Sequence, residues 1–187
     1  WVDLTGTVDG RPYGFAILND GKYGFDALDG TLRMTILRSP AYAHHDDARF
    51  DATEGHAIMD QGWHRCRFRL IPHAGPWRDA RVVQQSWELN SPIIAHNEAA
   101  HPGTRPRCAT LLGTESGDVL IGVVKQSEDG RALIVRGYET AGRTASTTLH
   151  LPYFGKHFDL EFAPHEIKTV RIDVATWDMR EVDLLES

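Results

Sequence analysis

A histidine-rich stretch contains the residues whose types most directly suggest metal chemistry. It consists of His44, His45, Asp46, Asp47 and His56. Imidazole and carboxylate side chains together form a typical ligand set for a divalent metal ion. However, adjacent histidines rarely bind one ion together, and preorganised sites normally lie on rigid elements rather than in loops. We therefore expect a solvated polar loop here and no metal site in this chain.

Paired carboxylates are the second group that could carry chemistry, as the acid and the nucleophile or base of glycoside hydrolysis. The sequence contains 26 acidic residues, which are too many for a pair to be singled out. Asp20, Asp29 and Asp129 fall in turn sequences, whereas Asp159 and Glu161 fall on outward positions of an expected strand. Turn chemistry and solubility account for such residues. We assign no catalytic residue, and no nucleophile motif or phosphate-binding glycine loop occurs.

Aromatic side chains are the third group, because exposed tryptophan and tyrosine rings can stack on sugar rings. Trp63, Trp77, Trp87 and Tyr42 could together form such a platform. Large aromatic side chains are highly buried on average. We therefore expect these residues to pack in a core between sheets, with a carbohydrate-binding platform as the alternative.

Alternation of apolar and polar residues with a period of two predicts the elements that position these side chains. Such alternation, or a short apolar run, occurs over residues 15–18, 31–36, 119–124, 132–135, 157–162 and 170–174. Asp-Gly turns within residues 19–21, 28–30 and 128–130 indicate hairpins. One short helix is expected within residues 77–87. Many short strands with frequent turns predict an all-β fold, namely an antiparallel β-sandwich.

Two long stretches resist assignment to strands, residues 39–62 and residues 90–117. Connections of this length are uncommon inside a compact domain and are usually functional or linking. We interpret the second as a domain boundary near residue 115. The expected organisation is a larger β domain over residues 1–115 and a small C-terminal β module over residues 116–187.

Composition excludes several classes of partner. The chain has 187 residues with 20 basic and 26 acidic side chains, a net charge of −6, which argues against binding to nucleic acid or to anionic membranes. No apolar run approaches the length of a membrane span.

Cys66 and Cys108 indicate no disulfide framework, and Cys66 is expected to be buried on a strand. The two cysteines favour a reducing compartment such as the cytoplasm, but the sequence leaves the compartment unknown. Since the chain begins at Trp1 without a methionine, we expect a part of a longer protein.

Four segments of the sequence resemble the C-terminal region of family 38 α-mannosidases. They contain the motifs LNDGKYG with LRSP, LIPHAG, VK-x-SEDG, and APHEIKTVRI followed by the tail Asp183–Glu186. The segments lie at residues 14–40, at 64–77 followed by 87–92, at 119–143, and at 163–172 with the tail at 183–186. They occur in the order expected for the family and together cover most of the chain.

The resemblance implies that this chain is the later part of a large β-sandwich followed by a small terminal β-sandwich module. The catalytic domain of such enzymes binds zinc, carries an aspartate nucleophile and precedes a helical domain. Both domains would be partners in the same polypeptide, and mannose-containing glycans would be bound by the whole enzyme. The chain itself would be a non-catalytic scaffold that completes the cleft and is inactive when isolated. A stand-alone carbohydrate-binding module and an assembly module for a homo-oligomer are the alternatives.

Arg38 is the residue that best matches an arginine of the sandwich that approaches the active-site cleft in this family. A guanidinium group can hydrogen-bond a sugar hydroxyl or a carboxylate, although an ordinary ion pair is its commoner use. The long loop that follows Arg38 is expected to contact the catalytic domain. Tyr42, His44 and His45 are its candidate interdomain residues.

Overall fold

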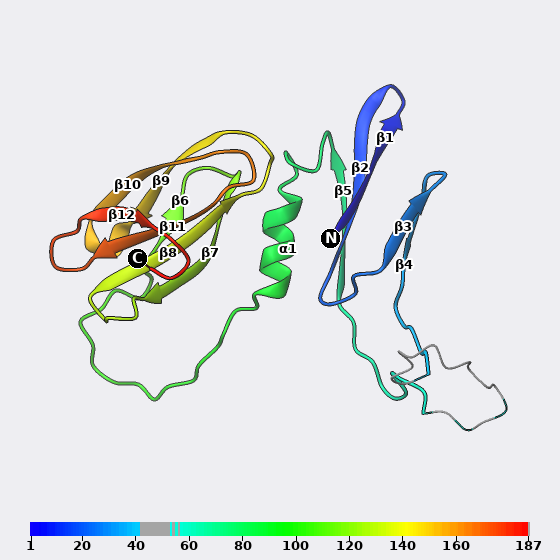
Figure 1. Cartoon of the computed structure of the whole chain (residues 1–187), viewed down its shortest axis with the longest axis horizontal. Coiled ribbons are helices and arrows are strands. Elements are labelled where there is room, and N and C mark those ends of the chain that lie inside the picture. The colour runs from blue at the N-terminus through cyan, green and yellow to red at the C-terminus, as the bar shows by residue number, and fades with distance from the viewer. Residues whose placement is uncertain (42–52, 54, 56, 187) are drawn as a thin grey trace. The chain divides into compact units, whose positions relative to one another are not determined.

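The computed structural model describes residues 1–41, 53, 55 and 57–186. The chain folds into two compact units, Trp1–Pro92 and Ile93–Ser187. Strands make up most of the regular structure in both units (Figure 1). Among the described residues, no helix has the length and apolar character that crossing a membrane requires.

The first unit is built on a three-stranded antiparallel sheet. Its strands are β1 (Val2–Val8), β2 (Arg11–Asn19) and β5 (Phe68–Ala74), in the order β1-β2-β5. Asp9 and Gly10 connect β1 to β2 with φ angles of 49° and 74°. Asp-Gly accepts this left-handed conformation readily, and it allows the tight turn of a hairpin.

A separate two-stranded ribbon follows β2. Its strands are β3 (Phe25–Leu28) and β4 (Thr31–Met34), and Asp29-Gly30 forms the predicted turn between them. The hairpin predicted at residues 19–21 is wrong, since β2 pairs with β1 and β5 and not with β3. The Asn19 side-chain oxygen instead accepts hydrogen bonds from the backbone N–H groups of Gly21 and Lys22, at 3.1 and 2.7 Å. This side-chain turn ends β2 and leads the chain out of the sheet.

Helix α1 (Val82–Asn90) covers one face of this sheet (Figure 1). Val82 is fully buried against Ala16 and Leu18 of β2, and partly buried residues surround this small core: Ile71, Trp77, Ala80 and Leu89. The Asn90 side chain donates a hydrogen bond of 3.0 Å to the backbone oxygen of Asn19. A helix was expected within residues 77–87. It begins later, because Arg81 adopts a left-handed conformation with φ of 54° immediately before it.

The second unit is a β-sandwich of two antiparallel sheets, with strand orders β12-β11-β8-β7 and β10-β9-β6 (Figure 1). Its elements are β6 (Gly113–Thr114), β7 (Val119–Gln126), β8 (Ala132–Glu139), β9 (Ala145–Leu151), a 3-10 helix (Pro152–Phe154), β10 (Lys156–Phe162), β11 (Ile167–Asp173) and β12 (Met179–Val182). The core contains Val119, Val135, Ala145, Leu149, Leu151, Leu160, Phe162, Val170 and Ile172. The all-β sandwich prediction is confirmed.

Strand alternation was predicted well in the second unit. On β10, Leu160 and Phe162 are buried while Asp159 and Glu161 are exposed. Strand β11 ends at Asp173, so Val174 lies beyond it and is exposed. The β7–β8 turn also forms where Asp129-Gly130 predicted it.

The prediction for Cys66 is wrong. Cys66 is only half-buried and precedes β5 instead of lying on it. The apolar residues that follow Cys66 at alternate positions, Phe68 and Leu70, are 40% and 59% exposed. The physical reason is that α1 covers the opposite face of the sheet, so alternation along β5 does not by itself determine which side is buried.

The long stretch between α1 and β6 forms neither helix nor strand over residues 91–112. The division between the two compact units falls at Pro92. The assignment of residues 1–115 and 116–187 to two domains of the family remains a prediction. The other long stretch, residues 39–62, is described only in part, and an isolated bridge pairs Ala41 with Ile58.

Candidate functional site

Arg38 lies in an irregular segment after β4, which ends at Met34, and its side chain is exposed. Within the described parts of the chain, the guanidinium group has no hydrogen bond and no ion pair. The proximity of Arg38 to a substrate stays a prediction. The other candidate residues lie outside the described residues, namely Tyr42, His44, His45, Asp46, Asp47 and His56.

The four aromatic residues predicted to share a core have different environments. Trp77 packs beside the small core of α1, with its ring 5.0 Å from that of Trp1 and the Arg78 guanidinium 4.3 Å from its centre. Trp63 is fully exposed and Trp87 is 40% exposed, so core packing is wrong for Trp63. Tyr42 lies outside the described residues.

The LIPHAG motif places His73 inside the first unit. The side chains of His73 and Asp3 are only 5% and 4% exposed, and the His73 Nε2 atom lies 2.8 Å from a carboxylate oxygen of Asp3. The Nδ1 atom lies 3.1 Å from the backbone oxygen of Gly75. Each ring nitrogen therefore has an oxygen atom within hydrogen-bonding distance. Since both ring nitrogens are engaged, His73 joins β5 to β1 and is not available to a metal or a sugar.

Gly14 on the intervening strand β2 makes this contact possible. A Cβ atom added at Gly14 would lie 2.1 Å from the His73 ring. Only glycine leaves the imidazole room to pass over β2 and reach Asp3. We therefore interpret Gly14, His73 and Asp3 as one structural unit, to which we refer below as the His73 staple.

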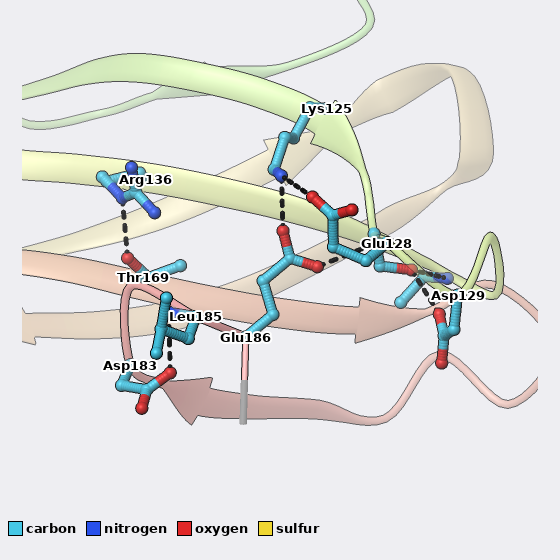
Figure 2. A network of polar contacts seen from close by, with 10 residues as sticks. Lys125, Glu128, Asp129, Arg136, Thr169, Asp183, Leu185 and Glu186 are labelled. Atoms are coloured by element: carbon cyan, nitrogen blue, oxygen red, sulfur yellow. Dashed lines mark hydrogen bonds and ion pairs between the residues drawn. The ribbon is translucent and has the colours of Figure 1, made fainter.

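The SEDG motif forms the turn between β7 and β8 (Figure 2). The Ser127 hydroxyl donates to Asp129 at 2.7 Å and accepts from the backbone N–H of Ala132 at 2.9 Å. The second carboxylate oxygen of Asp129 accepts a hydrogen bond of 2.7 Å from Arg171 on β11. Gly130 has a φ angle of 73°, which glycine adopts without strain. The motif thus joins the β7–β8 turn to β11 within the same four-stranded sheet.

The same turn anchors the tail Asp183–Glu186. Figure 2 shows the Glu186 carboxylate between the Lys125 ammonium group and the SEDG turn. One carboxylate oxygen pairs with Lys125, and the other accepts the backbone N–H of Glu128 at 2.9 Å. The tail follows β12, whereas Lys125 lies on β7, and these two strands are opposite edges of the four-stranded sheet. The tail therefore spans the sheet from one edge to the other.

The carboxylates of this network are held in the ionised form. The Ser127 hydroxyl, the backbone N–H of Arg131 and the Arg171 guanidinium keep the pKa of Asp129 well below its usual range. The Lys125 ammonium group and the Glu128 N–H lower the pKa of Glu186. A general acid near neutral pH needs a raised pKa. These groups therefore act as structural acceptors.

Glu139 is the most buried carboxylate of the second unit, at 2% exposed. It accepts hydrogen bonds from the backbone N–H groups of Ala141, Gly142 and His165 at 2.5, 2.8 and 2.9 Å. Burial pushes the pKa of Glu139 upward, but these hydrogen bonds together outweigh burial and leave the pKa lowered. Glu139 thereby ties the β8–β9 connection to the β10–β11 connection, and we refer to this arrangement as the Glu139 staple.

Six described carboxyl groups have a pKa clearly different from the ordinary value, and in all six the pKa is lowered. These residues are Asp20, Asp129, Glu139, Glu166, Asp173 and Glu186. Within residues 1–41, 53, 55 and 57–186, no group of three or more histidine, cysteine and acidic side chains is placed to hold a metal ion. In this part of the chain, the clustered charged groups stabilise turns and sheet edges.

The face of the β1-β2-β5 sheet opposite α1 exposes several apolar side chains that the fold of the first unit does not cover. Residues paired across an antiparallel sheet share a face, and the register places Ile17 with Leu70 and Asn19 with Phe68. Tyr13 and Val8 lie on the same face, and the exposed fractions of Val8, Tyr13, Phe68 and Leu70 are 56%, 40%, 40% and 59%. We call this surface the open apolar face. The continuous apolar run at residues 15–18 is a signal that could have revealed it, because strands buried on both faces have such runs.

Comparison with known proteins gives two family matches. The model described as "Glycosyl hydrolases family 38 C-terminal domain" matches residues 1–49. The model described as "Glycosyl hydrolases family 38 C-terminal beta sandwich domain" matches residues 118–158. The first match covers β1 to β4, and the second covers β7, β8, β9 and the start of β10. No solved structure matches the chain.

Several similar proteins are α-mannosidases. Alpha-mannosidase 2C1 of Homo sapiens is 33% identical over 81% of this chain, and alpha-mannosidase G of Dictyostelium discoideum is 29% identical over 76%. An alpha-mannosidase of Saccharomyces cerevisiae is 27% identical over 86%. The matched regions are only 13%, 12% and 15% of the lengths of these relatives. The similarity thus concerns a small part of much longer proteins.

Proposed function

Because the chain belongs to the C-terminal region of glycosyl hydrolase family 38, we propose that it is a non-catalytic scaffold of an α-mannosidase. Its role is to complete the cleft of a catalytic domain in the same polypeptide. The resemblance implies that this domain binds zinc, carries an aspartate nucleophile and cleaves mannose-containing glycans with retention. The reactive groups and the zinc ion would then lie outside the residues described above.

The open apolar face is the observation that carries this proposal. Full burial of a large apolar side chain stabilises by roughly 1.5–3 kcal/mol. Val8, Tyr13, Phe68 and Leu70 retain about half of their exposure, so covering them would contribute on the order of 1 kcal/mol each. A sheet with α1 on one side and these residues on the other is suited to packing between two layers. We propose that the second layer is another part of the same enzyme.

The domain assignment and the candidate interdomain residues belong to the same proposal. We assign residues 1–115 to the large sandwich and residues 116–187 to the small C-terminal domain. Arg38 and the loop containing Tyr42, His44 and His45 would lie toward the catalytic domain. The exposed position of Arg38 after β4 is compatible with this role.

Self-association is the competing explanation for the open apolar face, because two copies of the chain could cover each other. A homo-oligomer held by this face would dissociate when Leu70 is replaced by Glu. An intramolecular interface would keep the oligomeric state of the whole enzyme unchanged. Analytical ultracentrifugation of the whole enzyme and its Leu70→Glu variant distinguishes these outcomes.

The function itself is tested by activity measurements on the whole enzyme and on the 187-residue chain, with an α-mannoside that releases a chromophore. We expect hydrolysis by the whole enzyme and none by the chain. Hydrolysis by the isolated chain would contradict the scaffold role. The absence of α-mannoside hydrolysis from the whole enzyme would contradict the proposed activity.

A further inference from the structure

Three aromatic rings cluster in the second unit, in residues that the proposed scaffold role does not explain. Tyr153 and Phe154 lie in the 3-10 helix between β9 and β10, and Trp177 lies in the turn between β11 and β12. The ring centres of Tyr153 and Phe154 are 5.2 Å apart, as are those of Phe154 and Trp177. The Lys156 ammonium group lies 5.5 Å from the centre of the Trp177 ring. Residues far apart in the sequence therefore build one compact aromatic cluster.

The cluster is fixed in place but remains accessible. Trp177 packs against the core of the sandwich, which supports the cluster from inside. Tyr153 and Phe154 are each 47% exposed. The Tyr153–Phe154 contact is edge-to-face with an interplanar angle of 84°, a favourable geometry for two rings. A ligand would thus meet preorganised rings, and little side-chain entropy would be lost on binding.

A polar group suited to sugar hydroxyls lies beside the rings, namely the Lys156 ammonium group, 5.5 Å from the centre of the Trp177 ring. In the part of the chain that the structure describes, this ammonium group has no hydrogen-bond partner. A cleft of about 340 Å³ lined by Arg171, Asp173, Thr176, Asp178, Met179 and Arg180 is a separate feature, because none of the three rings lines it.

The size of the exposed aromatic surface favours a small ligand over a protein. A large aromatic side chain has roughly 150–250 Å² of surface, so two half-exposed rings present on the order of 200 Å². A standard protein–protein interface buries about 800 Å² on each partner. The apolar face of one sugar ring can cover one or two aromatic rings, and its hydroxyls need neighbouring charged or polar groups.

We propose that Tyr153, Phe154 and Trp177 form an accessory glycan-binding site that stacks on a hexopyranose ring, with the Lys156 ammonium group beside the rings available to its hydroxyls. The site would bind a glycan and takes no part in bond cleavage. The choice of mannose as the sugar rests on the proposed function, whereas the stacking site itself does not.

The proposal is tested by calorimetric titration of the 187-residue chain with methyl α-mannoside, methyl α-glucoside and soluble mannan. We expect mannan to bind and both Phe154→Ala and Tyr153→Ala to weaken binding by about tenfold. Tyr153→Phe keeps the ring and should bind within about twofold of the parent chain. The matched control is Tyr23→Ala, which removes an 85% exposed tyrosine of the first unit and should leave binding unchanged. Thermal unfolding of each variant identifies any loss of binding that follows from loss of folding.

The possible outcomes separate the site from the proposed function. Absence of binding to all three probes at millimolar concentration would overturn the site, as would equal losses in Tyr23→Ala and Tyr153→Ala. Binding of the glucoside but not of the mannoside or mannan would support the stacking site and overturn its assignment to mannose. Hydrolysis of mannan by the isolated chain would contradict the scaffold role while leaving the binding result intact.

Discussion

The two units of this chain use similar residues but differ in how completely they bury their apolar surface. In the second unit, two sheets face each other and enclose a continuous core. In the first unit, α1 covers one face of a three-stranded sheet, and the other face keeps Phe68 and Leu70 exposed. The sandwich encloses its own core, whereas the exposed face of the three-stranded sheet supports our proposal that this sheet is one layer of a larger assembly.

Each unit also contains a buried charged group that joins distant segments. The His73 staple joins β5 to β1 through another side chain, with Asp3 as the partner. The Glu139 staple joins two connections through backbone N–H groups alone. A staple that depends on a second charged side chain should be the more costly one to break, because its loss leaves a buried charge without a partner.

The largest effect is expected from His73→Leu in the first unit. Removing the imidazole leaves the Asp3 carboxylate buried and unpaired, which costs about 3–5 kcal/mol in the free energy of unfolding. Urea unfolding followed by tryptophan fluorescence measures this loss. His96→Leu, at an exposed histidine, is the control and should change the free energy by less than about 0.5 kcal/mol. A loss below about 1 kcal/mol for His73→Leu would contradict a stabilising role for the His73 staple in the first unit.

A smaller effect is expected from Glu139→Gln in the second unit. The amide cannot accept all the backbone hydrogen bonds of the carboxylate, so we expect a loss of about 2–3 kcal/mol. Glu161→Gln, on an exposed position of β10, is the matched control. If both variants unfold at the same urea concentration, Glu139 does not join the two connections in the way described.

The pH dependence of Glu139→Gln sharpens this prediction. The folded-state pKa of Glu139 is lowered, so the ionised carboxylate stabilises the fold above the unfolded-state pKa, near 4.5. This stabilisation is lost as the pH falls from there through the lower folded-state pKa. The parent chain should therefore lose stability below about pH 4.5 more steeply than Glu139→Gln. Parallel stability curves for the two proteins would contradict this assignment.

Local turn chemistry explains which parts of the fold were predictable from the sequence. Asp29-Gly30 and Asp129-Gly130 form the predicted hairpin turns because the residues themselves favour the required backbone angles. The LNDG turn differs because the Asn19 side chain closes it without pairing the flanking strands. Such a side-chain turn and a hairpin have similar sequences, so the sequence alone does not distinguish them.

Features that depend on distant partners could not be predicted. Asp3 and His73 are 70 positions apart, and the folded sheet brings Lys125 next to Glu186 in the tail. The exposure of Leu70 depends on which face α1 covers, and alternation along a strand does not contain that information. The aromatic cluster of Phe154 and Trp177 likewise joins two turns whose proximity follows from sandwich packing. The motifs and some of their turns were recognisable in the sequence, but their contacts with distant residues were not.

We propose that another part of the enzyme covers the open apolar face, and Leu70→Glu tests this proposal. The substitution should be made both in the isolated chain and in the whole enzyme, with Leu111→Glu, at a 62% exposed leucine, as the control. We predict less than about 0.5 kcal/mol of destabilisation in the isolated chain, where Leu70 is 59% exposed. In the whole enzyme, burying the carboxylate should cost about 2–4 kcal/mol. Equal, small effects in both proteins would contradict the claim, because Leu70 would then face solvent in the complete enzyme as well.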